Sequence, residues 1–338
     1  MKIPYRTRKL LQRIGITVLI LLLVVVLILV ANLLWSDKYI YYTRQGAVMD
    51  RNQPPISENG KLAVPPDGSE RVPIYYDDGQ SAANTNQELT QLVGYYIDAE
   101  QLQDISAVKA QLQALPRGTP VMVEVKSIYG SYYYSSAITS TRSDDIDPAA
   151  MDELIRYLDQ SGAYIIAKLP ALRDKEYGLN HVDDGVFDTR GAYLWVDDNG
   201  CYWLNPAKEG TLNRLTIAIN ELKGLGFDEV VFDDFCLPED ANASVNEEML
   251  QSLVAAAKTL VSSCATDSFA VSFVGDGDFQ LPEGRTRLYV KSAAAAEAVE
   301  IAQKLNFEDP AVKLVFLTEN HDTRFNAYGV LRPLSSAH

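Results

Sequence analysis

After Leu92, the sequence alternates between short apolar runs and longer amphipathic segments. The short runs are rich in Val, Ile and Phe and lack regular polar alternation, which is typical of strands buried on both faces of a parallel sheet. We expect strands of this kind at Val93–Ile97, Val121–Val125, Tyr164–Leu169, Glu229–Phe235, Phe269–Val274, Arg287–Val290 and Lys313–Leu317. Because helical segments separate them, the sequence predicts an α/β fold with a parallel sheet.

The segments between these strands predict helices at Asp104–Leu115, Pro148–Gln160, Thr211–Leu225, Asn246–Ser262 and Ala293–Leu305. Asp147 and Pro148 form a favourable start for the second helix, because an acidic cap and a proline in the first turn suit the unpaired N–H groups there. In the third helix, Leu215, Ile219 and Leu222 fall on one face, as expected for a helix that packs against a sheet.

The number of strands indicates the architecture. Seven strands in residues 91–338 fit the roughly 250 residues of a TIM-type (β/α)8 barrel better than a doubly wound sheet of four or five strands. Tyr328–Leu331 is the candidate for the eighth strand, and the alternative is an incomplete barrel. Ala192–Leu204 is divided by the turn-forming sequence Asp197–Gly200, which predicts a β-hairpin inserted after the third strand.

Near the amino terminus, Ile14–Leu34 is an apolar run without a charged residue. A helix of about 20 such residues crosses the hydrocarbon core of a bilayer. Five basic residues precede the run, and no acidic residue occurs before Asp37. We therefore expect residues 1–13 in the cytoplasm, a single-pass signal-anchor at 14–35 in the cell membrane, and everything after it outside. A cleaved signal peptide is the alternative, but its apolar region would be shorter, about 7–15 residues.

Composition separates a linker from the barrel domain. Residues 36–90 contain prolines among Asn, Ser, Gly and Asp, which predicts an extended extracellular linker before the domain at 91–338. The sequence after the anchor contains 25 of the 30 Lys and Arg residues and all 45 Asp and Glu residues. This acidic excess argues against nucleic acid or anionic lipid as a partner of the domain. Three cysteines are too few for a disulfide framework, and a single Cys201–Cys236 bond is weakly favoured.

Charged residues follow several of the predicted strands, at the end of a barrel where active sites lie. The sharpest motif is Val230–Phe235, in which Asp233 and Asp234 close an apolar strand. Side chains alternate along a strand, so only one of these carboxylates can point into the barrel. Glycoside hydrolysis needs two carboxyl groups, which Asp233 and Glu319 could provide, with Asp234 as a third catalytic candidate. The alternative is that the aspartates cap a helix or hold a structural ion.

Further polar and aromatic residues are candidates for sugar binding. Aromatic rings offer apolar surfaces that fit the C–H faces of sugars, and Tyr and Trp also carry a polar atom. The expected substrate-binding residues at strand ends and in the following loops are Tyr95, Asp98, Lys126, Lys168, Arg173, Trp195, Trp203 and Asp276. The run Tyr129–Tyr134 fits either a sugar-binding loop or a packed hairpin or partner interface.

Four elements of the sequence, at their spacing, resemble a known family. They are Tyr164–Pro170, Gly191–Trp195, Trp203–Pro206 and Gly226–Asp233. Together they resemble a family of exported bacterial glycosyl hydrolase-like domains, related in outline to the α-amylase-type barrels, over about Leu92 to Pro333. The resemblance implies a TIM barrel that acts on a polysaccharide such as cell-wall glycan, with Asp233 as the strand-four aspartate. Asn205, in the Trp-Leu-Asn-Pro element, joins the expected substrate-binding residues. Where the family commonly has Arg, this sequence has Cys236.

Two other functions are compatible with parts of this pattern. A non-catalytic barrel that binds cell-wall glycan during envelope or septum assembly would use the same aromatic residues without a second carboxylate facing Asp233. A metal-dependent polysaccharide deacetylase would need two histidines one helical turn apart, and His181, His321 and His338 have no such spacing. We therefore expect no metal site, and hydrolysis by a carboxylate pair requires no cofactor.

Overall fold

A computed structural model of the chain describes residues 40–43, 46–49, 88–139, 141–291 and 294–336. The chain divides into two compact units, Met1–Ser81 and Ala82–His338. In the first unit, β1 (Ile40–Thr43) pairs antiparallel with β2 (Gly46–Met49).

The predicted cytoplasmic segment 1–13 and the predicted membrane anchor 14–35 lie outside the described residues. The part of the chain that is described contains no helix with the length and apolar character needed to cross a bilayer.

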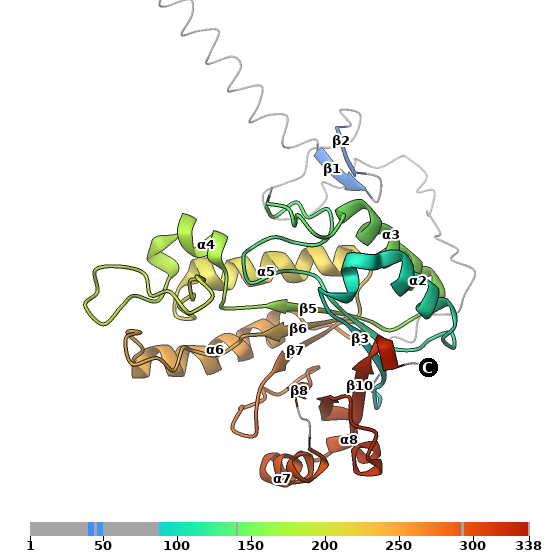
Figure 1. Cartoon of the computed structure of the whole chain (residues 1–338). Helices are drawn as coiled ribbons and strands as arrows, with labels where there is room; N and C mark the ends of the chain where they lie inside the picture. The colour runs from blue at the N-terminus through green and yellow to red at the C-terminus, as the bar shows by residue number, and fades with distance from the viewer. Residues whose placement is uncertain (1–39, 44–45, 50–87, 140, 292–293, 337–338) are drawn as a thin grey trace, which may run out of the picture. The chain divides into compact units, whose positions relative to one another are not determined.

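In the described part of the second unit, eight parallel strands close into a barrel in the order β10-β3-β4-β5-β6-β7-β8-β9 (Figure 1). The strands are β3 (Val93–Ile97), β4 (Val121–Glu124), β5 (Ile165–Pro170), β6 (Glu229–Asp233), β7 (Ala270–Val274), β8 (Leu288–Lys291), β9 (Leu314–Leu317) and β10 (Gly329–Pro333). Every predicted strand is confirmed, with ends that shift by no more than two residues. Because β10 pairs with both β9 and β3, the barrel is complete.

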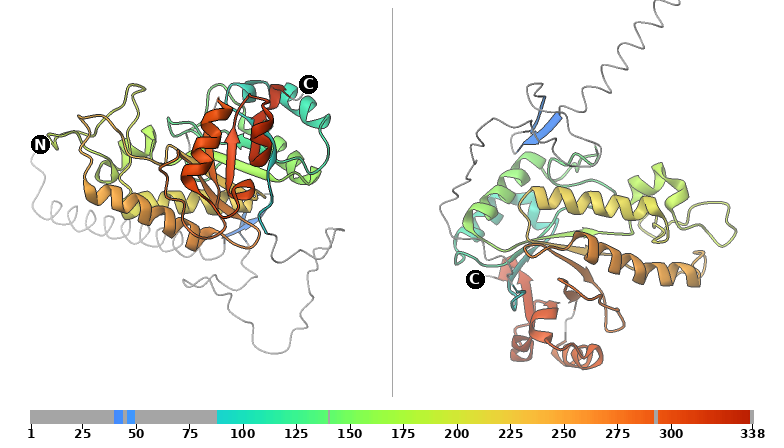
Figure 2. Two further views of the ribbon diagram at one scale, coloured as in Figure 1. Left: turned by 90° about the horizontal axis from the view of Figure 1, so that it is seen from below. Right: turned by 180° about the vertical axis from the view of Figure 1, so that it is seen from behind.

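Helices surround the outside of these strands (Figures 1 and 2). The five predicted ones are confirmed as α2 (Ile105–Gln113), α3 (Pro148–Ser161), α5 (Glu209–Gly224), α6 (Glu247–Cys264) and α7 (Ala295–Leu305). Asp147 caps α3 by accepting a hydrogen bond from the Ala149 N–H at 3.1 Å. Two short helices, α4 (Lys175–Asn180) and α8 (Pro310–Lys313), were not predicted, because four to six residues are too few to display a helical period.

Period-two alternation along the strands builds the barrel interior in layers. The middle layer consists of Met122, Ile166, Val231, Tyr289, Val315 and Leu331, and its one polar group is the Tyr289 hydroxyl, which reaches Glu229 in the layer below. Two residues further along four of the strands, on the same face, come Glu124, Lys168, Asp233 and Lys291, which we call the upper ionic layer. Two residues earlier, at the amino-terminal ends, lie Tyr164, Glu229 and Arg287, which with Ser272 and Tyr289 form the lower ionic layer.

The segment between β5 and α5, residues 171–208, forms a folded insertion that includes α4 and extends to the left in Figure 1. The predicted hairpin exists only at its tip, where Val196 bridges Tyr202 in antiparallel fashion. The flanking residues bridge elsewhere, with Leu194 opposite Phe187 and Trp203 opposite Arg173.

The weakly favoured disulfide between Cys201 and Cys236 is absent, and Cys264 is also free. Cys201 is buried within the insertion, whereas Cys236 is exposed after β6, so the expectation of a bond was wrong.

Candidate functional site

The upper ionic layer brings together side chains from four different strands. The Lys168 Nζ lies 3.2 Å from Glu124 Oε2 and 3.0 Å from Asp233 Oδ2. The Lys291 Nζ lies 2.9 Å from the same Asp233 oxygen. Positive and negative groups therefore alternate from β4 through β5 and β6 to β8. Each carboxylate has a cation beside it, which offsets the cost of removing these charges from water.

A cavity of about 270 Å³ opens beside this layer at the carboxyl ends of the strands. Its lining consists of Tyr96, Ile97, Asp98, Met122, Glu124, Lys168, Lys291 and Leu317. Catalytic residues of TIM-type barrels come from this end of the strands. The cavity, with charged groups at its walls and the apolar Met122 among its lining residues, is therefore the candidate active site.

Asp233 and Asp234 are consecutive, but their environments push their pKa values in opposite directions. Burial opposes ionisation of Asp233, yet the charges of Lys168 and Lys291 outweigh it and hold the pKa of this carboxyl below its ordinary value. Burial and the neighbouring Asp233 carboxylate instead raise the pKa of Asp234, against the lowering effect of Arg173 and the two lysines. Oppositely shifted carboxyl groups in one site are the usual arrangement for acid–base chemistry.

The backbone fixes Asp234 in an unusual conformation. Its φ angle is +49°, in the left-handed region that Asp enters more readily than most residues. The Asp233 carbonyl accepts a hydrogen bond from the Ala171 N–H at 2.7 Å, and the Asp234 carbonyl accepts one from the Leu172 N–H at 3.3 Å. These bonds continue the pairing of β5 with the end of β6. Left-handed residues of this kind are often found at functional sites.

Arg173 extends from the insertion toward the same place. Its Nε donates to Asp197 Oδ2 at 2.5 Å, and its Nη1 lies 4.0 Å from Asp234 Oδ2. The guanidinium also lies over the Trp203 ring, 5.8 Å from the ring centre. Trp203 is itself nearly buried, and its indole N–H donates to Asp197 at 3.1 Å. The predicted substrate-binding residues Arg173 and Trp203 thus belong to one hydrogen-bonded group beside Asp234.

Asp233 and Asp234 are not among the residues that line the cavity, and Asp233 adjoins it through the lining residues Lys168 and Lys291. The other predicted site residues differ in their relation to the cavity. Asp98 lines it, with Oδ1 accepting from the Gln101 N–H at 2.9 Å. Tyr95 packs against the core outside the barrel, and its neighbour Tyr96 lines the cavity instead. Asp276 is exposed after β7, and its carboxylate accepts from the Asp278 N–H.

Two predicted residues are buried in supporting contacts. The Lys126 Nζ pairs with Asp174 Oδ2 at 2.8 Å, with both side chains almost fully buried. Asn205 is also buried, and its Oδ1 accepts from the Ala207 N–H at the start of a turn. Trp195 is half-buried, with its ring centre 6.4 Å from that of Trp203.

Glu319, the predicted partner of Asp233, is exposed after β9. Burial, and after it the charges of Glu319 and Asp98, raise the pKa of Tyr96. The carboxylate joined to Asp233 through a shared cation is Glu124. Glu124 and Lys291 carried no role in the sequence-based prediction, although each lies two residues after an interior apolar residue, and that spacing was the signal for both.

The aromatic run in the loop after β4 is mostly packed inside the protein. Tyr132, Tyr133 and Tyr134 are buried, whereas Tyr129 is half exposed. The Tyr134 hydroxyl donates to Glu221 Oε2 on α5 at 2.7 Å, and Lys126 bridges Tyr132 in antiparallel fashion. This supports the packed alternative for these three residues.

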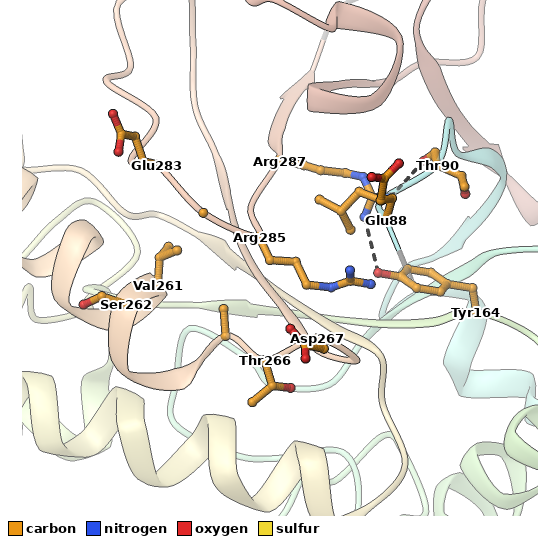
Figure 3. Close-up of a pocket in the computed structure, with 13 residues that line it drawn as sticks. Glu88, Thr90, Tyr164, Val261, Ser262, Thr266, Asp267, Glu283, Arg285 and Arg287 are labelled. Atoms are coloured by element: carbon orange, nitrogen blue, oxygen red, sulfur yellow. Dashed lines mark hydrogen bonds between the residues drawn. The ribbon is translucent and has the colours of Figure 1, made fainter. Parts of the chain in front are cut away.

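A larger cavity, of about 1310 Å³, lies at the opposite, amino-terminal end of the strands (Figure 3). Arg285 and Arg287 reach toward Tyr164 there, and Val261, Ser262 and Glu283 line another side. Arg287 forms an ion pair with Glu229 and donates hydrogen bonds to the Tyr164 hydroxyl and the Thr90 carbonyl. These contacts indicate that Arg287 stabilises the fold at this end of the barrel. Because this end of a TIM-type barrel usually serves stability, we assign the chemistry to the smaller cavity.

Within the described residues, no group of three His, Cys, Asp or Glu side chains is arranged to hold a metal ion. A comparison of the chain with curated proteins found no match.

Comparison with family models identifies the barrel. The model described as "Putative glycosyl hydrolase domain" matches residues 94–266, more than half of the chain. The chain belongs to this family. The match covers β3 to β6 and therefore includes Glu124, Lys168, Asp233 and Asp234 of the site.

Several solved structures are similar to the chain at low sequence identity. The α-galactosidase from Lactobacillus brevis has a TM-score of 0.51 and 10% identity over 73% of this chain, which spans 37% of that enzyme's length. The glycoside hydrolase domain of PelA from Pseudomonas aeruginosa has a TM-score of 0.45 and 13% identity, covering 74% of this chain and 97% of that domain. A hypothetical protein from Ruminiclostridium thermocellum has a TM-score of 0.41 and 19% identity, covering 53% of this chain and 96% of that one.

Proposed function

We propose that the chain is a membrane-anchored glycoside hydrolase that acts outside the cytoplasmic membrane on a polysaccharide or cell-wall glycan. Membership of the family described as "Putative glycosyl hydrolase domain" supports the reaction class. The apolar run at residues 14–35, with basic residues before it, supports the anchor and an extracytoplasmic barrel. The acidic excess after the anchor fits a neutral or cationic glycan better than an anionic polymer.

The observation that carries the proposal is the placement of Asp233 and Asp234 at the carboxyl end of β6, where two lysines contact Asp233 and Arg173 lies 4.0 Å from Asp234. The lysines keep Asp233 ionised near neutral pH, so it can attack the anomeric carbon or stabilise positive charge there. The raised pKa of Asp234 keeps a larger fraction of it protonated, so it can donate a proton to the departing sugar oxygen. Glu319 and Glu124 are the alternative proton donors. They are tested by Glu319→Gln and Glu124→Gln.

A second function, non-catalytic glycan binding, is favoured by one observation. Lys168 and Lys291 both contact Asp233, and Lys291 reaches both of its carboxylate oxygens. An oxygen that is engaged by ammonium groups attacks carbon less readily, so a barrel arranged in this way could retain a glycan without cleaving it.

The two functions are distinguished by assaying the full-length chain against a panel of 4-nitrophenyl glycosides and purified cell-wall polysaccharide. We expect release of nitrophenol or new reducing ends, and a loss of at least about a hundredfold for Asp233→Asn. Asp267→Asn, an exposed carboxylate at the opposite end of the barrel, is the matched control and should keep full activity. Retention of polysaccharide by the wild-type chain without any product would leave the binding function and overturn hydrolysis.

A further inference from the structure

The two adjacent aspartates differ in what restrains them. Asp233 has two lysines in contact with its carboxylate, at 3.0 and 2.9 Å. Asp234 shares the electrostatic influence of those lysines, but the cation nearest to it is Arg173, with Nη1 at 4.0 Å from Oδ2. A proton donor must point at the departing oxygen, so its side chain needs a restraint of its own. Arg173 is in position to supply it.

Arg173 is itself held firmly by the insertion. Its Nε bonds to Asp197 Oδ2, which also accepts the Trp203 indole N–H. The other oxygen of Asp197 accepts the Asn199 and Cys201 N–H groups at 2.9 and 3.0 Å. The Arg173 and Asp197 side chains are only 16% and 10% exposed, so solvent competes little for this pair. The Asp197 carboxylate is therefore held in place at the turn of the insertion, and it holds the Arg173 guanidinium in turn.

The shape of a guanidinium allows it to serve both carboxylates. Arginine has separate donors in a planar fork, so binding through Nε leaves Nη1 available. At 4.0 Å, Nη1 is beyond hydrogen-bond distance from Asp234, and an approach of about 1 Å would form the bond. The groups that bear on Asp234 are thus Asp233, Lys168 and Lys291 from the barrel, and Arg173 from the insertion.

We propose that Arg173 is the positioning residue of Asp234, and that Asp197 acts on the site through Arg173. The proposal rests on the proposed function, in which Asp234 donates the proton. It makes the insertion at residues 171–208 part of the active site, because the turn that carries Asp197 determines where the guanidinium lies. If Arg173 served only to fasten the insertion, its removal would lower stability and leave the Asp234 carboxyl unchanged.

The first test follows the titration of Asp234 by NMR in the full-length chain, labelled with ¹³C at the Asp carboxyl groups. The Asp234 signal is assigned with Asp234→Asn. Arg173→Gln should raise the Asp234 midpoint by about one pH unit, because an opposite charge has been removed, and should move Asp233 much less. Arg190→Gln, which removes an exposed arginine of the same insertion paired with Asp188, should move neither. A folded Arg173→Gln protein with an unchanged Asp234 midpoint would overturn the proposal.

The second test asks whether Asp197 acts through Arg173. Cleavage of an unactivated alkyl glycoside, whose departing oxygen needs a proton, is measured for Asp197→Asn, Arg173→Gln and the double variant. We expect Asp197→Asn to lower kcat in the wild-type background and to have no further effect once Arg173 is replaced. If the fold loss of kcat in the double variant equals the product of the fold losses in the two single variants, the proposal is contradicted. If the wild-type chain cleaves no glycoside, the proposed function fails, and the titration still decides whether Arg173 controls Asp234.

Discussion

The barrel interior carries an ionic layer at each end, and the two layers are closed to different degrees. In the lower layer, Glu229 accepts hydrogen bonds from the hydroxyls of Tyr164, Ser272 and Tyr289 at 2.9, 2.5 and 3.0 Å. Its remaining partner is Arg287, and both charged side chains are at most 1% exposed. Every oxygen of this carboxylate is occupied, as stability requires of a buried charge.

The upper layer uses the same alternation along the strands but stays open. The Lys168, Glu124 and Lys291 side chains are 19%, 22% and 59% exposed. Its carboxylates are paired with cations that solvent or a substrate can reach. A closed ionic layer stabilises the barrel, whereas an open one leaves charge available to a ligand. The closed lower layer therefore suits a stabilising role, and the open upper layer suits the ligand contact proposed above.

The largest effect is expected from breaking the lower layer. Arg287→Met would leave the Glu229 charge buried without a cation, which costs about 3–5 kcal/mol of unfolding free energy. Chemical denaturation of the full-length chain measures this loss. Adding Glu229→Met should recover part of it, because the uncompensated charge is then gone. An Arg287→Met protein as stable as the wild type would remove the distinction between the two layers.

The matched change in the upper layer should affect activity rather than stability. Lys291→Met removes an exposed cation, so the unfolding free energy should change by less than about 1 kcal/mol. The Lys291 charge lowers the pKa of Asp233, so its removal raises that pKa. Under the proposed function the ionised form of Asp233 is the active one, so the acidic limb of the pH–rate profile should move upward by about one pH unit. A profile that does not move would separate Asp233 from the reaction.

A smaller effect is expected at the amino-terminal end, where Asp228 makes the unfolding free energy depend on pH. Burial, with Asp159 and Glu229 nearby, raises the pKa of Asp228 to about 6. An unfolded Asp titrates near about 3.9, so the native state loses stability as pH rises from about 4 to about 6. Asp228→Asn can still accept the Ile165 N–H, so it should match the wild type at pH 4. At pH 7 it should be more stable by on the order of 1 kcal/mol. Equal pH dependence of the two unfolding curves would contradict this.

Sequence reasoning located the fold well because the signals were local. Each strand is a short apolar run, and each long helix has a visible period, so the (β/α)8 barrel followed from order and length. Asp233 belongs to the interior layer because it lies two residues after the interior Val231, and that alternation is also readable from the sequence.

The surroundings of the site depended on contacts between distant segments. Lys126 is buried because Asp174, from the next strand's loop, pairs with it, and no local pattern indicates that partner. Likewise, Tyr134 of the loop after β4 depends on Glu221 of helix α5 for its hydrogen-bond acceptor. Glu319 was the predicted partner of Asp233, and only the structure reveals that Glu124 shares Lys168 with Asp233.

The division of roles between Asp233 and Asp234 is tested most directly by the dependence on the leaving group. A 2,4-dinitrophenyl glycoside departs without a proton, whereas an unactivated alkyl glycoside of the same sugar needs one. We predict that Asp234→Asn lowers kcat/KM for the alkyl glycoside by about 10²–10⁴-fold and leaves kcat/KM for the dinitrophenyl glycoside close to the wild-type value, because this parameter reports the step in which the leaving group departs. Asp233→Asn should slow both. The account is contradicted if Asp234→Asn slows both glycosides equally. It is also contradicted if Glu319→Gln, rather than Asp234→Asn, slows only the alkyl glycoside.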